Sequence, residues 1–358
     1  MTSVVASKKK KVFVALSGGI DSAVAAVLLK EKGYEVVGCF MRLHDYRLES
    51  QELSEKSAHE IANVLKIDFK IFDFQQEFQK KIIFPFLKDY ENGLTPNPCV
   101  FCNEKIKFDL FWKYAREEGA DLMATGHYAR IKRNKHGISL YRAKDKSKDQ
   151  SYFLWRLKRE QLDKIIFPLG KYSKKEIRKI GKQWGLKAVE RKESMEICFV
   201  PGKIEEFLHN NLILSSGSVL NSFGKIIGHH KGLPLYTIGQ RKRIGLSGGP
   251  YYVRSKNTDN NTIVVTKDKN ELKRRILFCH RINWLDVRTL RCPIKVKAQI
   301  RYSHKPARGF MFSEGRGIYK IIFNLKQSSI TPGQSVVFYR RLKLLGGAVI
   351  MPSGDVPI

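Results

Sequence analysis

The first half of the chain alternates between short apolar runs and segments whose apolar residues recur at helical spacing. Two of the helical segments stop at glycine, Gly33 and Gly119, as helices commonly do. Alternation of this kind predicts a parallel sheet with helices on both faces. The predicted strands are 12–16, 35–41, 67–74 and 121–125, and the predicted helices are 22–32, 54–65 and 103–118.

The pattern changes near Pro201. Residues 217–250 are rich in glycine and carry only short apolar pieces, and from about His280 the pattern is that of β structure. In residues 292–301 apolar positions alternate with Lys, Gln and Arg, and further short strands are separated by Gly and Pro turns. We therefore predict an α/β protein in which a helix-flanked parallel sheet precedes a small adaptor and a C-terminal β-barrel. The expected boundaries are 1–205, 206–278 and 279–358.

The excess of positive charge adds information about a binding partner to this prediction of the fold. The chain carries 66 Lys and Arg against 34 Asp and Glu, a formal net charge of +32 over 358 residues. Residues 280–358 alone carry 14 Lys and Arg against 3 Asp and Glu. Such a surplus favours a nucleic acid partner that docks on the β-barrel, although a solvated lysine-rich surface is the simpler alternative.

The sequence shows neither a membrane-spanning segment nor the apolar core of a signal peptide. No run approaches the ~20 apolar residues of a membrane-spanning helix. The apolar run Val12–Leu16 is too short for the core of a signal peptide and leads directly into a glycine-rich loop. We expect a cytoplasmic protein with no membrane partner.

The sharpest local motif is Ser17-Gly18-Gly19-Ile20-Asp21-Ser22, here called the SGGIDS loop. It lies between a predicted strand and a predicted helix, where glycines let backbone N–H groups approach phosphate oxygens and the helix N-terminus adds positive potential. Asp21 is a candidate ligand for Mg²⁺. A Walker lysine and a GxGxxG motif are both absent, which disfavours a kinase-type loop and a dinucleotide fold.

The six cysteines are too few for a disulfide framework in a chain of this length, so a cysteine pair suggests catalysis or metal binding. Cys102 is predicted near the start of a helix, where the helix field lowers the pKa of a thiol. Cys198 lies in the apolar segment SMEICFVPG, an environment typical of a small core residue. The residues alone leave the role of Cys198 open.

Several segments together resemble a known family. SGGIDS is similar to the signature of the PP-loop ATP pyrophosphatases, which transfer AMP to a carbonyl oxygen and release pyrophosphate. The other segments, in the same order over nearly the whole chain, resemble the bacterial tRNA-specific 2-thiouridylases within that superfamily. These segments are TPNPCVFCNEKIKF (95–108), ATGHYAR (124–130), KDQSYFLW (148–155), EICF (196–199), GQRKRIGLSGGPYYV (239–253) and TPGQSVVFY (331–339).

The resemblance implies a specific reaction. ATP, with Mg²⁺, adenylates the C2 carbonyl of the wobble uridine of a tRNA, and sulfur from a cysteine persulfide then replaces the activated oxygen to give 2-thiouridine. The family pattern assigns the persulfide to Cys198 and the nucleophile to Cys102. It also implies a partner protein that donates the sulfur.

The resemblance further implies binding residues, carried over position by position. Nucleotide-binding positions are Ala15, Leu16, Ser17, Gly18, Gly19, Ile20, Asp21, Ser22, Met41 and Gly126. Positions around the target base are Asn97, Pro98 and Cys99. Positions that contact tRNA are His127, Lys148, Asp149, Gln150, Arg301, Tyr302 and Gln334.

Cys99 departs from the pattern, because many relatives carry aspartate at this position as a proposed proton carrier. We therefore assign no general acid or base. Cys99, Cys102 and Cys198 are also three thiols suited to a [4Fe–4S] cluster with one open iron. We favour a Cys102–Cys198 relay, because C-x₂-C arises here by one substitution and no fourth cysteine is evident nearby.

Two other function classes compete with the thiouridylase. A PP-loop enzyme acting on a small molecule explains the SGGIDS loop but neither the basic β region nor the two cysteines. A non-catalytic RNA-binding protein explains the charge but neither an intact loop nor both thiols. Consumption of ATP that depends on added tRNA separates the thiouridylase from both.

Overall fold

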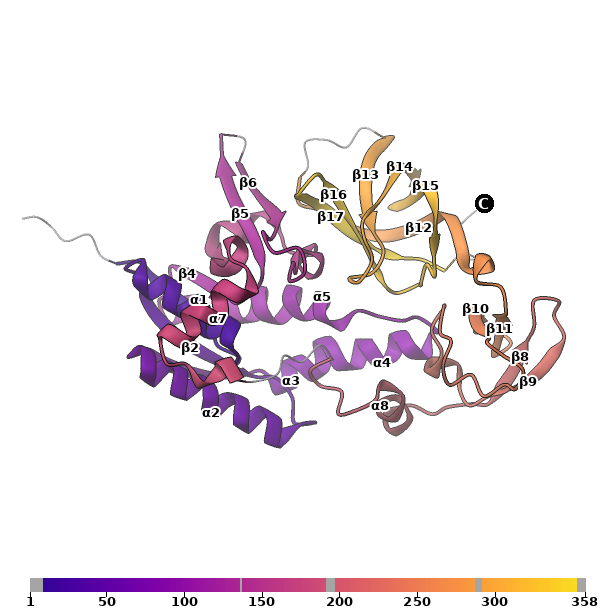
Figure 1. Ribbon diagram of the computed structural model, residues 1–358, viewed down its shortest axis with the longest axis horizontal. Helices are drawn as coiled ribbons and strands as arrows, with labels where there is room; N and C mark the ends of the chain where they lie inside the picture. Colours follow the sequence, from indigo (N-terminus) through magenta and orange to yellow (C-terminus); the bar gives the residue numbers. More distant parts are fainter. Residues whose placement is uncertain (1–8, 136, 191–196, 287–291, 353–358) are drawn as a thin grey trace, which may run out of the picture. The chain divides into compact units, whose positions relative to one another are not determined.

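The computed structural model describes residues 9–135, 137–190, 197–286 and 292–352, arranged in two compact units (Figure 1). The first unit contains the chain up to residue 79, residues 100–199 and residues 342–344. The second contains residues 80–99, residues 200–341 and the chain from residue 345. Glu196 of the EICF segment lies outside the described residues.

A five-stranded parallel sheet forms the centre of the first unit, in the order β3-β2-β1-β4-β7. Ala15 pairs with Cys39 on one side and with Thr125 on the other, so the carboxyl ends of three strands share one edge. This parallel sheet confirms the predicted strand–helix alternation. The strands are β1 (Lys11–Ala15), β2 (Glu35–Arg42), β3 (Asp68–Asp73), β4 (Leu122–Thr125) and β7 (Ile165–Ile166).

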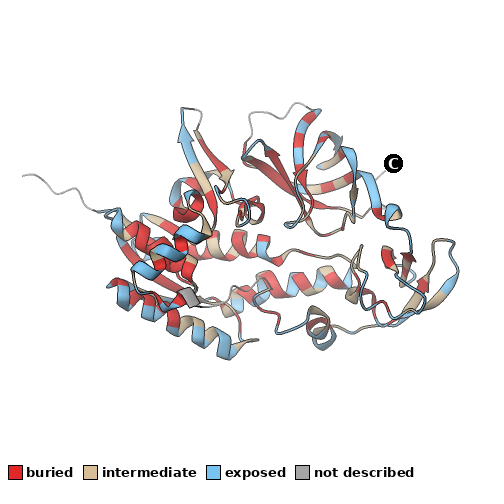
Figure 2. Cartoon of the chain, viewed as in Figure 1, coloured by how far each residue is buried: buried red, intermediate tan, exposed pale blue. Residues whose placement is uncertain are grey.

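Three helices flank this sheet: α1 (Ile20–Glu31), α2 (Leu48–Leu65) and α7 (Lys174–Gln183). The alanines, valines and leucines of α1 favour a helix, and its residues 22–29 are all buried in the core. α2 buries one face and leaves the other to solvent, as Figure 2 shows in alternating colours. The start of α2 lies six residues before the predicted position, because the amphipathic pattern begins in a polar stretch.

One long helix, which belongs to the first unit from residue 100 onward, starts earlier than the sequence predicted. It begins as α5 (Pro98–Cys102), continues as the π-helix η2 (Asn103–Leu110) and ends as α6 (Phe111–Glu117). Proline is well suited to a first helical position, because it has no N–H to leave unsatisfied. The helix starts five residues before the predicted position, so Cys102 lies in its second turn, and Pro98 and Cys99 occupy the first turn.

Several shorter elements of the first unit were not predicted. They include an antiparallel pair of strands and a series of 3₁₀ turns that follow it. The elements are β5 (Ala129–Asn134), β6 (Gly137–Arg142), α3 (Gln75–Phe78), the π-helix η1 (Gln79–Ile83, which enters the second unit), η3 (Ser151–Leu154), η4 (Arg159–Lys164), η5 (Pro168–Lys171) and η6 (Lys187–Glu190).

The second unit contains a small four-stranded sheet in the order β10-β11-β8-β9. Its core comprises Val219, Val253, Ile263 and Val265, together with Tyr236. The elements of this part are α4 (Phe84–Glu91), α8 (Ile204–Asn211), β8 (Gly217–Leu220), β9 (Ile226–His230), η7 (Leu233–Leu235), β10 (Tyr252–Asn257), β11 (Thr262–Thr266) and η8 (Lys269–Leu272).

The same unit ends in a six-stranded antiparallel β-barrel, as predicted. Its strand order is β12-β15-β14-β13-β16-β17, and pairing of β12 with β17 closes it. Closure leaves no unpaired sheet edge between these strands. The strands are β12 (Lys273–Trp284), β13 (Ile294–Gln299), β14 (Ala307–Gly315), β15 (Ile318–Ser328), β16 (Ser335–Arg340) and β17 (Lys343–Ile350).

The predicted alternation along β13 holds with one exception. Ile294, Val296 and Ala298 are buried in the barrel core, while Lys295 and Lys297 are exposed. Gln299 was expected on the polar face but is only 3% exposed. Its amide nitrogen donates to the carbonyls of Arg301 (3.2 Å) and Tyr302 (2.8 Å), so it fixes the chain where the strand ends.

No helix among the described residues is long and apolar enough to cross a membrane. The predicted boundary between adaptor and barrel remains a prediction, because both parts fall within the second unit.

Candidate active site

The SGGIDS loop is held by hydrogen bonds among its own residues and by helix α2, where the Ser57 hydroxyl donates to the Gly18 carbonyl at 2.9 Å. The backbone N–H of Ser17 donates to the Ser22 hydroxyl (3.1 Å), which in turn donates to the Gly19 carbonyl (2.9 Å). Gly18 has φ +73°, and a Cβ there would lie 2.4 Å from a backbone oxygen of α2, so only glycine fits. The loop therefore delivers the N-terminus of α1 to the carboxyl edge of the sheet, where open α/β sheets bind ligands.

The remaining predicted nucleotide positions lie along the same edge. Met41 follows Cys39 by two residues on β2, beyond the point where β1 ends. Gly126 directly follows β4, and a Cβ there would lie 2.8 Å from the backbone nitrogen of Ser22. The sheet thus brings together three parts of the sequence that the family pattern assigned to one nucleotide.

Asp21 lies in the first turn of α1 and is bound by two side chains from elsewhere in the unit. Lys174 donates from Nζ to both carboxylate oxygens, at 2.8 and 2.9 Å, and the Tyr128 hydroxyl donates at 2.7 Å. Gly19, not Asp21, is the N-cap of α1. Asp21 is therefore part of a charged cluster at the loop rather than a helix cap.

Sequence reasoning missed Lys174 and Tyr128, and only one local signal was present. Ser173 and Glu176 form an S-x-x-E capping box, in which the Glu176 carboxylate accepts from the Ser173 N–H at 2.6 Å. That motif predicts the start of α7 and places Lys174 at its first position. Nothing local links residue 174 to residue 21, since only the packing of α7 against α1 brings them together.

His127 lies in an aromatic pocket next to Gly126. Its Nδ1 is 2.8 Å from the Thr125 hydroxyl, and the rings of Phe108 and Phe167 pack around it. Burial, and to a lesser extent the charge of Lys107, lower the pKa of His127 well below its usual range. The imidazole is therefore neutral at physiological pH and suited to contacts through hydrogen bonds rather than charge.

Of the three residues predicted to contact tRNA at positions 148–150, Asp149 and Gln150 make hydrogen bonds within the protein. Asp149 is 4% exposed, and its carboxylate accepts from Arg142 Nε (2.5 Å) and from the Ala143 N–H (2.9 Å). Gln150 accepts from the Tyr128 N–H at 3.0 Å. Lys148 is half-buried. Any contact of Asp149 with RNA would have to use its backbone, whereas Gln150 supports the strand end that carries Tyr128.

The cysteines differ in burial and in position: Cys39, Cys102 and Cys279 are buried, whereas Cys99, Cys198 and Cys292 are exposed. Burial raises the pKa of Cys39 and of Cys279 well above the ordinary value, so both are unreactive core residues. Cys102 is 6% exposed in the second turn of the long helix, and Cys99 and Cys198 are exposed. The helix field declines beyond the first turn, so it acts on Cys99 more than on Cys102. The two proposed relay thiols, Cys102 and Cys198, both belong to the first unit.

Residues 95–99, here called the TPNPC segment, are held by distant parts of the second unit. The Gln334 amide donates to the carbonyls of Thr95 (2.7 Å) and Pro96 (3.2 Å), and the Thr95 N–H donates to the Pro332 carbonyl (3.0 Å). The hydroxyls of Thr95 and Thr237 are 3.2 Å apart. These contacts fix the backbone that presents half-buried Asn97, buried Pro98 and exposed Cys99.

Two of the residues predicted to contact tRNA therefore also stabilise the structure of the second unit. Gln334 holds the TPNPC segment, and Arg301 donates to the Ile238 carbonyl (3.0 Å) and to the Thr331 hydroxyl. Tyr302 is 36% exposed, so its ring is available at the surface. The loop around Gln334 and Arg301 thus connects the barrel to the segment assigned to the target base.

The residues at the SGGIDS loop are suited to a Mg²⁺ ion that binds together with a nucleotide. Mg²⁺ in nucleotide sites is commonly held by one or two carboxylates together with phosphate oxygens, and Asp21 supplies one carboxylate at the loop. Across the described ranges, no three His, Cys, Asp or Glu side chains are grouped so as to hold a metal. The [4Fe–4S] cluster therefore stays a prediction, and we derive no step through it.

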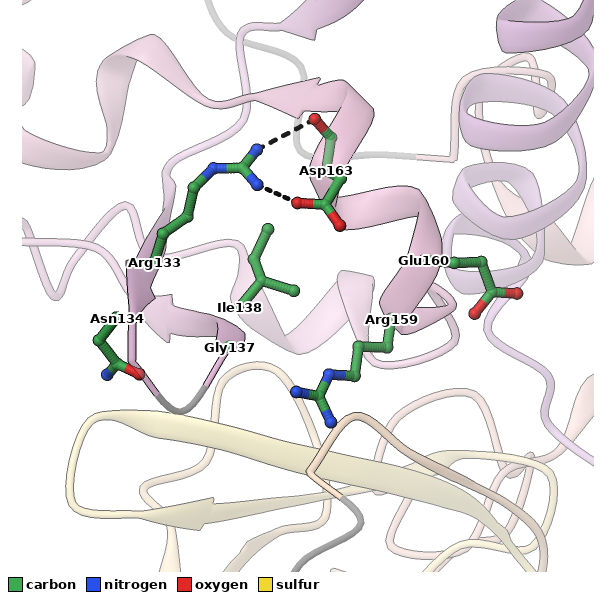
Figure 3. Close-up of a pocket in the computed structure, with 7 residues that line it drawn as sticks. All are labelled: Arg133, Asn134, Gly137, Ile138, Arg159, Glu160 and Asp163. Atoms are coloured by element: carbon green, nitrogen blue, oxygen red, sulfur yellow. Dashed lines mark hydrogen bonds and ion pairs between the residues drawn. The ribbon is translucent and has the colours of Figure 1, made fainter.

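A cavity of about 450 Å³ lies between the β5–β6 hairpin and η4 (Figure 3). Arg133 and Asp163 form an ion pair on its rim, and Arg159 and Ile138 also line it. A Cβ at Gly137 would meet the Arg159 guanidinium at 2.3 Å, so glycine gives that side chain room. None of the lining residues belongs to the SGGIDS loop, and the cavity is distinct from the nucleotide edge.

Comparison with known protein families covers nearly the whole chain. Residues 10–202 match the family described as tRNA methyl transferase HUP domain, and residues 205–267 match tRNA methyl transferase PRC-barrel domain. Residues 274–350 match Aminomethyltransferase beta-barrel domain. The three ranges follow one another in the order of the three predicted parts.

Individual relatives are named for a different activity from the domain descriptions. The tRNA-specific 2-thiouridylase MnmA of Syntrophomonas wolfei is 43% identical over 95% of this chain and 99% of its own length. Clostridium tetani tRNA-specific 2-thiouridylase MnmA 1 is 43% identical over 96% and 97%. The corresponding protein of Clostridium perfringens is 40% identical over 96% and 98%. Full-length similarity at this level ties the chain to these relatives as a whole.

Proposed function

The chain belongs to the family of the tRNA-specific 2-thiouridylases, and we propose that it uses ATP to exchange the C2 oxygen of a tRNA wobble uridine for sulfur. One observation carries the proposal beyond the family relationship. The first unit contains both the SGGIDS loop, at the carboxyl edge of its sheet, and Cys102 and Cys198, the two cysteines of the proposed relay. The groups proposed for activation and for sulfur transfer thus belong to one compact unit.

The first step is activation of a poor electrophile. The C2 oxygen of the uridine attacks the α-phosphorus of ATP, the bond to the β-phosphate breaks, and pyrophosphate leaves. The N–H groups at the start of α1 and the hydroxyl of Ser17 are proposed to bind phosphate oxygens, while the Ser22 hydroxyl donates to the Gly19 carbonyl and holds the loop. Mg²⁺, held by Asp21 and the phosphates, supplies charge neutralisation when it is bound. Met41 and Gly126 border the same edge and are proposed to bind the rest of the nucleotide.

The second step exchanges the activated oxygen for sulfur. The terminal sulfur of a Cys198 persulfide attacks C2, and AMP leaves with the former C2 oxygen. The Cys102 thiolate then attacks the Cys198 sulfur, which releases thiolated uridine and leaves a Cys102–Cys198 disulfide. A thiol reductant must reduce that disulfide, and a persulfide-bearing donor protein must reload Cys198. Exposure of Cys198 supports its role as the residue that the donor reaches.

Docking of tRNA is proposed for the barrel. On the outside of β13, Lys297 lies directly opposite Arg308 of β14, and both are exposed. Like charges directly opposite each other destabilise an antiparallel pair, so a partner that neutralises them would relieve this cost. Lys295 extends the same face. Phosphate groups of tRNA are the partner expected for such a face.

The target uridine is proposed to lie against the TPNPC segment. Asn97, Pro98 and Cys99 follow a backbone that Gln334 and Thr237 hold in place. His127, Lys148, Gln150, Arg301 and Tyr302 are proposed to contact the surrounding tRNA, and the substrate implies a cytoplasmic location. The role of Cys99 is proposed to be accessory, because the relay needs only two thiols.

The decisive test is the dependence of ATP cleavage on tRNA. We expect pyrophosphate release from ATP only when tRNA with an unmodified wobble uridine is present, and none with a tRNA whose wobble uridine is replaced by cytidine. A small-molecule ligase would ignore both tRNAs, and a non-catalytic RNA-binding protein would bind both and release no pyrophosphate. Similarity to thiouridylases over 95% of the chain favours the first outcome.

A further inference from the structure

We propose that Lys174 is the cation of the nucleotide site and contacts the phosphates of ATP, a role that rests on the proposed function. A triphosphate brings about four negative charges, whereas the N-terminus of a helix offers the equivalent of roughly half a positive charge. The segment Ala15–Ser22 contains no lysine or arginine of its own. A loop that binds a triphosphate therefore needs a cation from elsewhere in the fold.

Geometry assigns that cation to Lys174. Its ammonium group lies 2.8 and 2.9 Å from the two carboxylate oxygens of Asp21, in the first turn of α1. The Lys174 side chain is 11% exposed and that of Asp21 is 32% exposed, so the pair faces the loop rather than open solvent. The ammonium group is thus already at the end of the helix where phosphate binds.

The backbone around Lys174 is fixed, whereas its side chain is able to change partner. Ser173 caps α7, and the Lys174 N–H donates to the Asp145 carboxylate at 3.1 Å. α7 also packs against α1 through the shared core that contains Ile177. A lysine on a fixed backbone keeps a flexible four-carbon stem with three donors. It is therefore able to turn from Asp21 to a phosphate oxygen while Asp21 turns to Mg²⁺.

A purely structural ion pair is the competing explanation, and the number of phosphates separates the two. If Lys174 only stabilised the start of α7 or α1, its loss would affect all ligands of the loop alike. If it contacts phosphate, its loss affects a triphosphate and leaves adenosine unaffected. A hydrogen bond to a charged group is worth about 1.5–3 kcal/mol, which corresponds to about a 10- to 150-fold change in Kd.

The experiment measures binding of α,β-methylene-ATP with Mg²⁺, and of adenosine, to the full-length protein by calorimetry. We expect Lys174→Met to weaken binding of the triphosphate analogue by about 10- to 100-fold, with adenosine affinity unchanged. Lys174→Arg should retain part of the affinity. Lys175→Met is the matched control, because Lys175 is the next residue on α7 and is exposed. This variant should bind both ligands like the wild-type protein.

Three results would overturn the proposal. Wild-type affinity of a folded Lys174→Met protein for the analogue would make the ion pair structural, and so would an equal loss for adenosine and the analogue. Failure of the wild-type protein to bind the analogue would instead refute the proposed function, and the role of Lys174 with it. If Lys174→Met does not fold, Lys174→Gln keeps a donor for Asp21 without the charge, and the same comparison of two ligands decides.

Discussion

The SGGIDS loop and the TPNPC segment are both assigned to substrate binding, yet they are held in opposite ways. Within the loop, the hydrogen bonds of Ser17, Gly19 and Ser22 span at most five residues of sequence. The backbone of the TPNPC segment instead depends on Gln334 and Thr237, which lie 239 and 142 residues away from Thr95. The turn of the loop is therefore set largely within its own sequence, although Asp21 is bound by Lys174 and Tyr128. The backbone of the TPNPC segment instead depends on distant parts of the second unit.

This difference suggests a division of labour. The first unit contains the proposed nucleotide site and both proposed relay thiols, while the second unit contains the TPNPC segment, proposed to present the base, and the barrel face proposed to bind tRNA. Damage to the loop should therefore abolish adenylation itself. Damage to the supports of the TPNPC segment should leave nucleotide binding intact and slow only the reaction with tRNA.

The largest expected effect is on the sulfur-transfer step in the first unit. Cys102→Ser and Cys198→Ser should each abolish thiolation, because hydroxyls neither carry persulfide sulfur nor resolve it. Pyrophosphate release with tRNA should persist in both, since activation precedes sulfur transfer. Quantification of 2-thiouridine in digested tRNA, alongside pyrophosphate release, measures the two steps separately.

Cys99→Ser is the matched control for those two variants, because its thiol lies on the TPNPC segment of the second unit. We expect it to retain substantial thiolation. Loss of all activity in Cys99→Ser, together with iron in anaerobically purified protein, would favour the [4Fe–4S] alternative over the relay. Full activity in a colourless, iron-free preparation would eliminate the cluster.

Asp21→Ala should lower the rate of pyrophosphate release by at least about 100-fold, which is the several kcal/mol that metal organisation of a phosphoryl group contributes. The fold should be retained, because Asp21 does not cap its helix. Asp21→Asn keeps an acceptor for Tyr128 and removes the charge, so it tests charge separately from geometry. Unchanged pyrophosphate release in Asp21→Ala, with normal thermal stability, would mean that the nucleotide does not use this carboxylate.

Charge on the barrel should affect tRNA affinity and leave the nucleotide site unchanged. The double variant Lys297→Ala/Arg308→Ala should weaken tRNA binding about 10-fold and reduce the dependence of log Kd on log salt by about 2, as expected for two lost phosphate contacts. The matched control, Lys32→Ala/Lys175→Ala, removes two exposed charges from the first unit. An identical salt dependence for both variants would show that the barrel face is an ordinary solvated surface.

Gln334→Ala should have the smallest effect and the most selective one. It removes two hydrogen bonds to the TPNPC segment, each worth about 0.5 kcal/mol at the lower end of the usual range, so thiolation should slow by about 5-fold. Affinity for the ATP analogue should match that of wild type. A parallel loss of ATP affinity would contradict the division between loop and segment.

Prediction from sequence succeeded where structure is local and failed where it depends on distant packing. The strands, α1 and the SGGIDS loop carry their own patterns, and the alternation along β13 was clear in the sequence. The predicted start of the long helix, residue 103, is five residues late, because the apolar periodicity is clear only beyond Pro98, although proline suits the first turn of a helix. The contacts of Lys174 with Asp21 and of Gln334 with Thr95 have no local signal, since each joins residues more than 150 positions apart.

The central claim is that one protein couples cleavage of ATP to exchange of oxygen for sulfur on a tRNA uridine. The most direct test incubates the full-length protein with unmodified tRNA, Mg²⁺, ATP, a persulfide donor and a thiol reductant, and follows pyrophosphate and the mass of the wobble nucleoside together. We predict one pyrophosphate for each uridine whose mass increases by the exchange of one oxygen for one sulfur. Pyrophosphate release without tRNA, or a uridine that stays unchanged while ATP is consumed, would contradict the account.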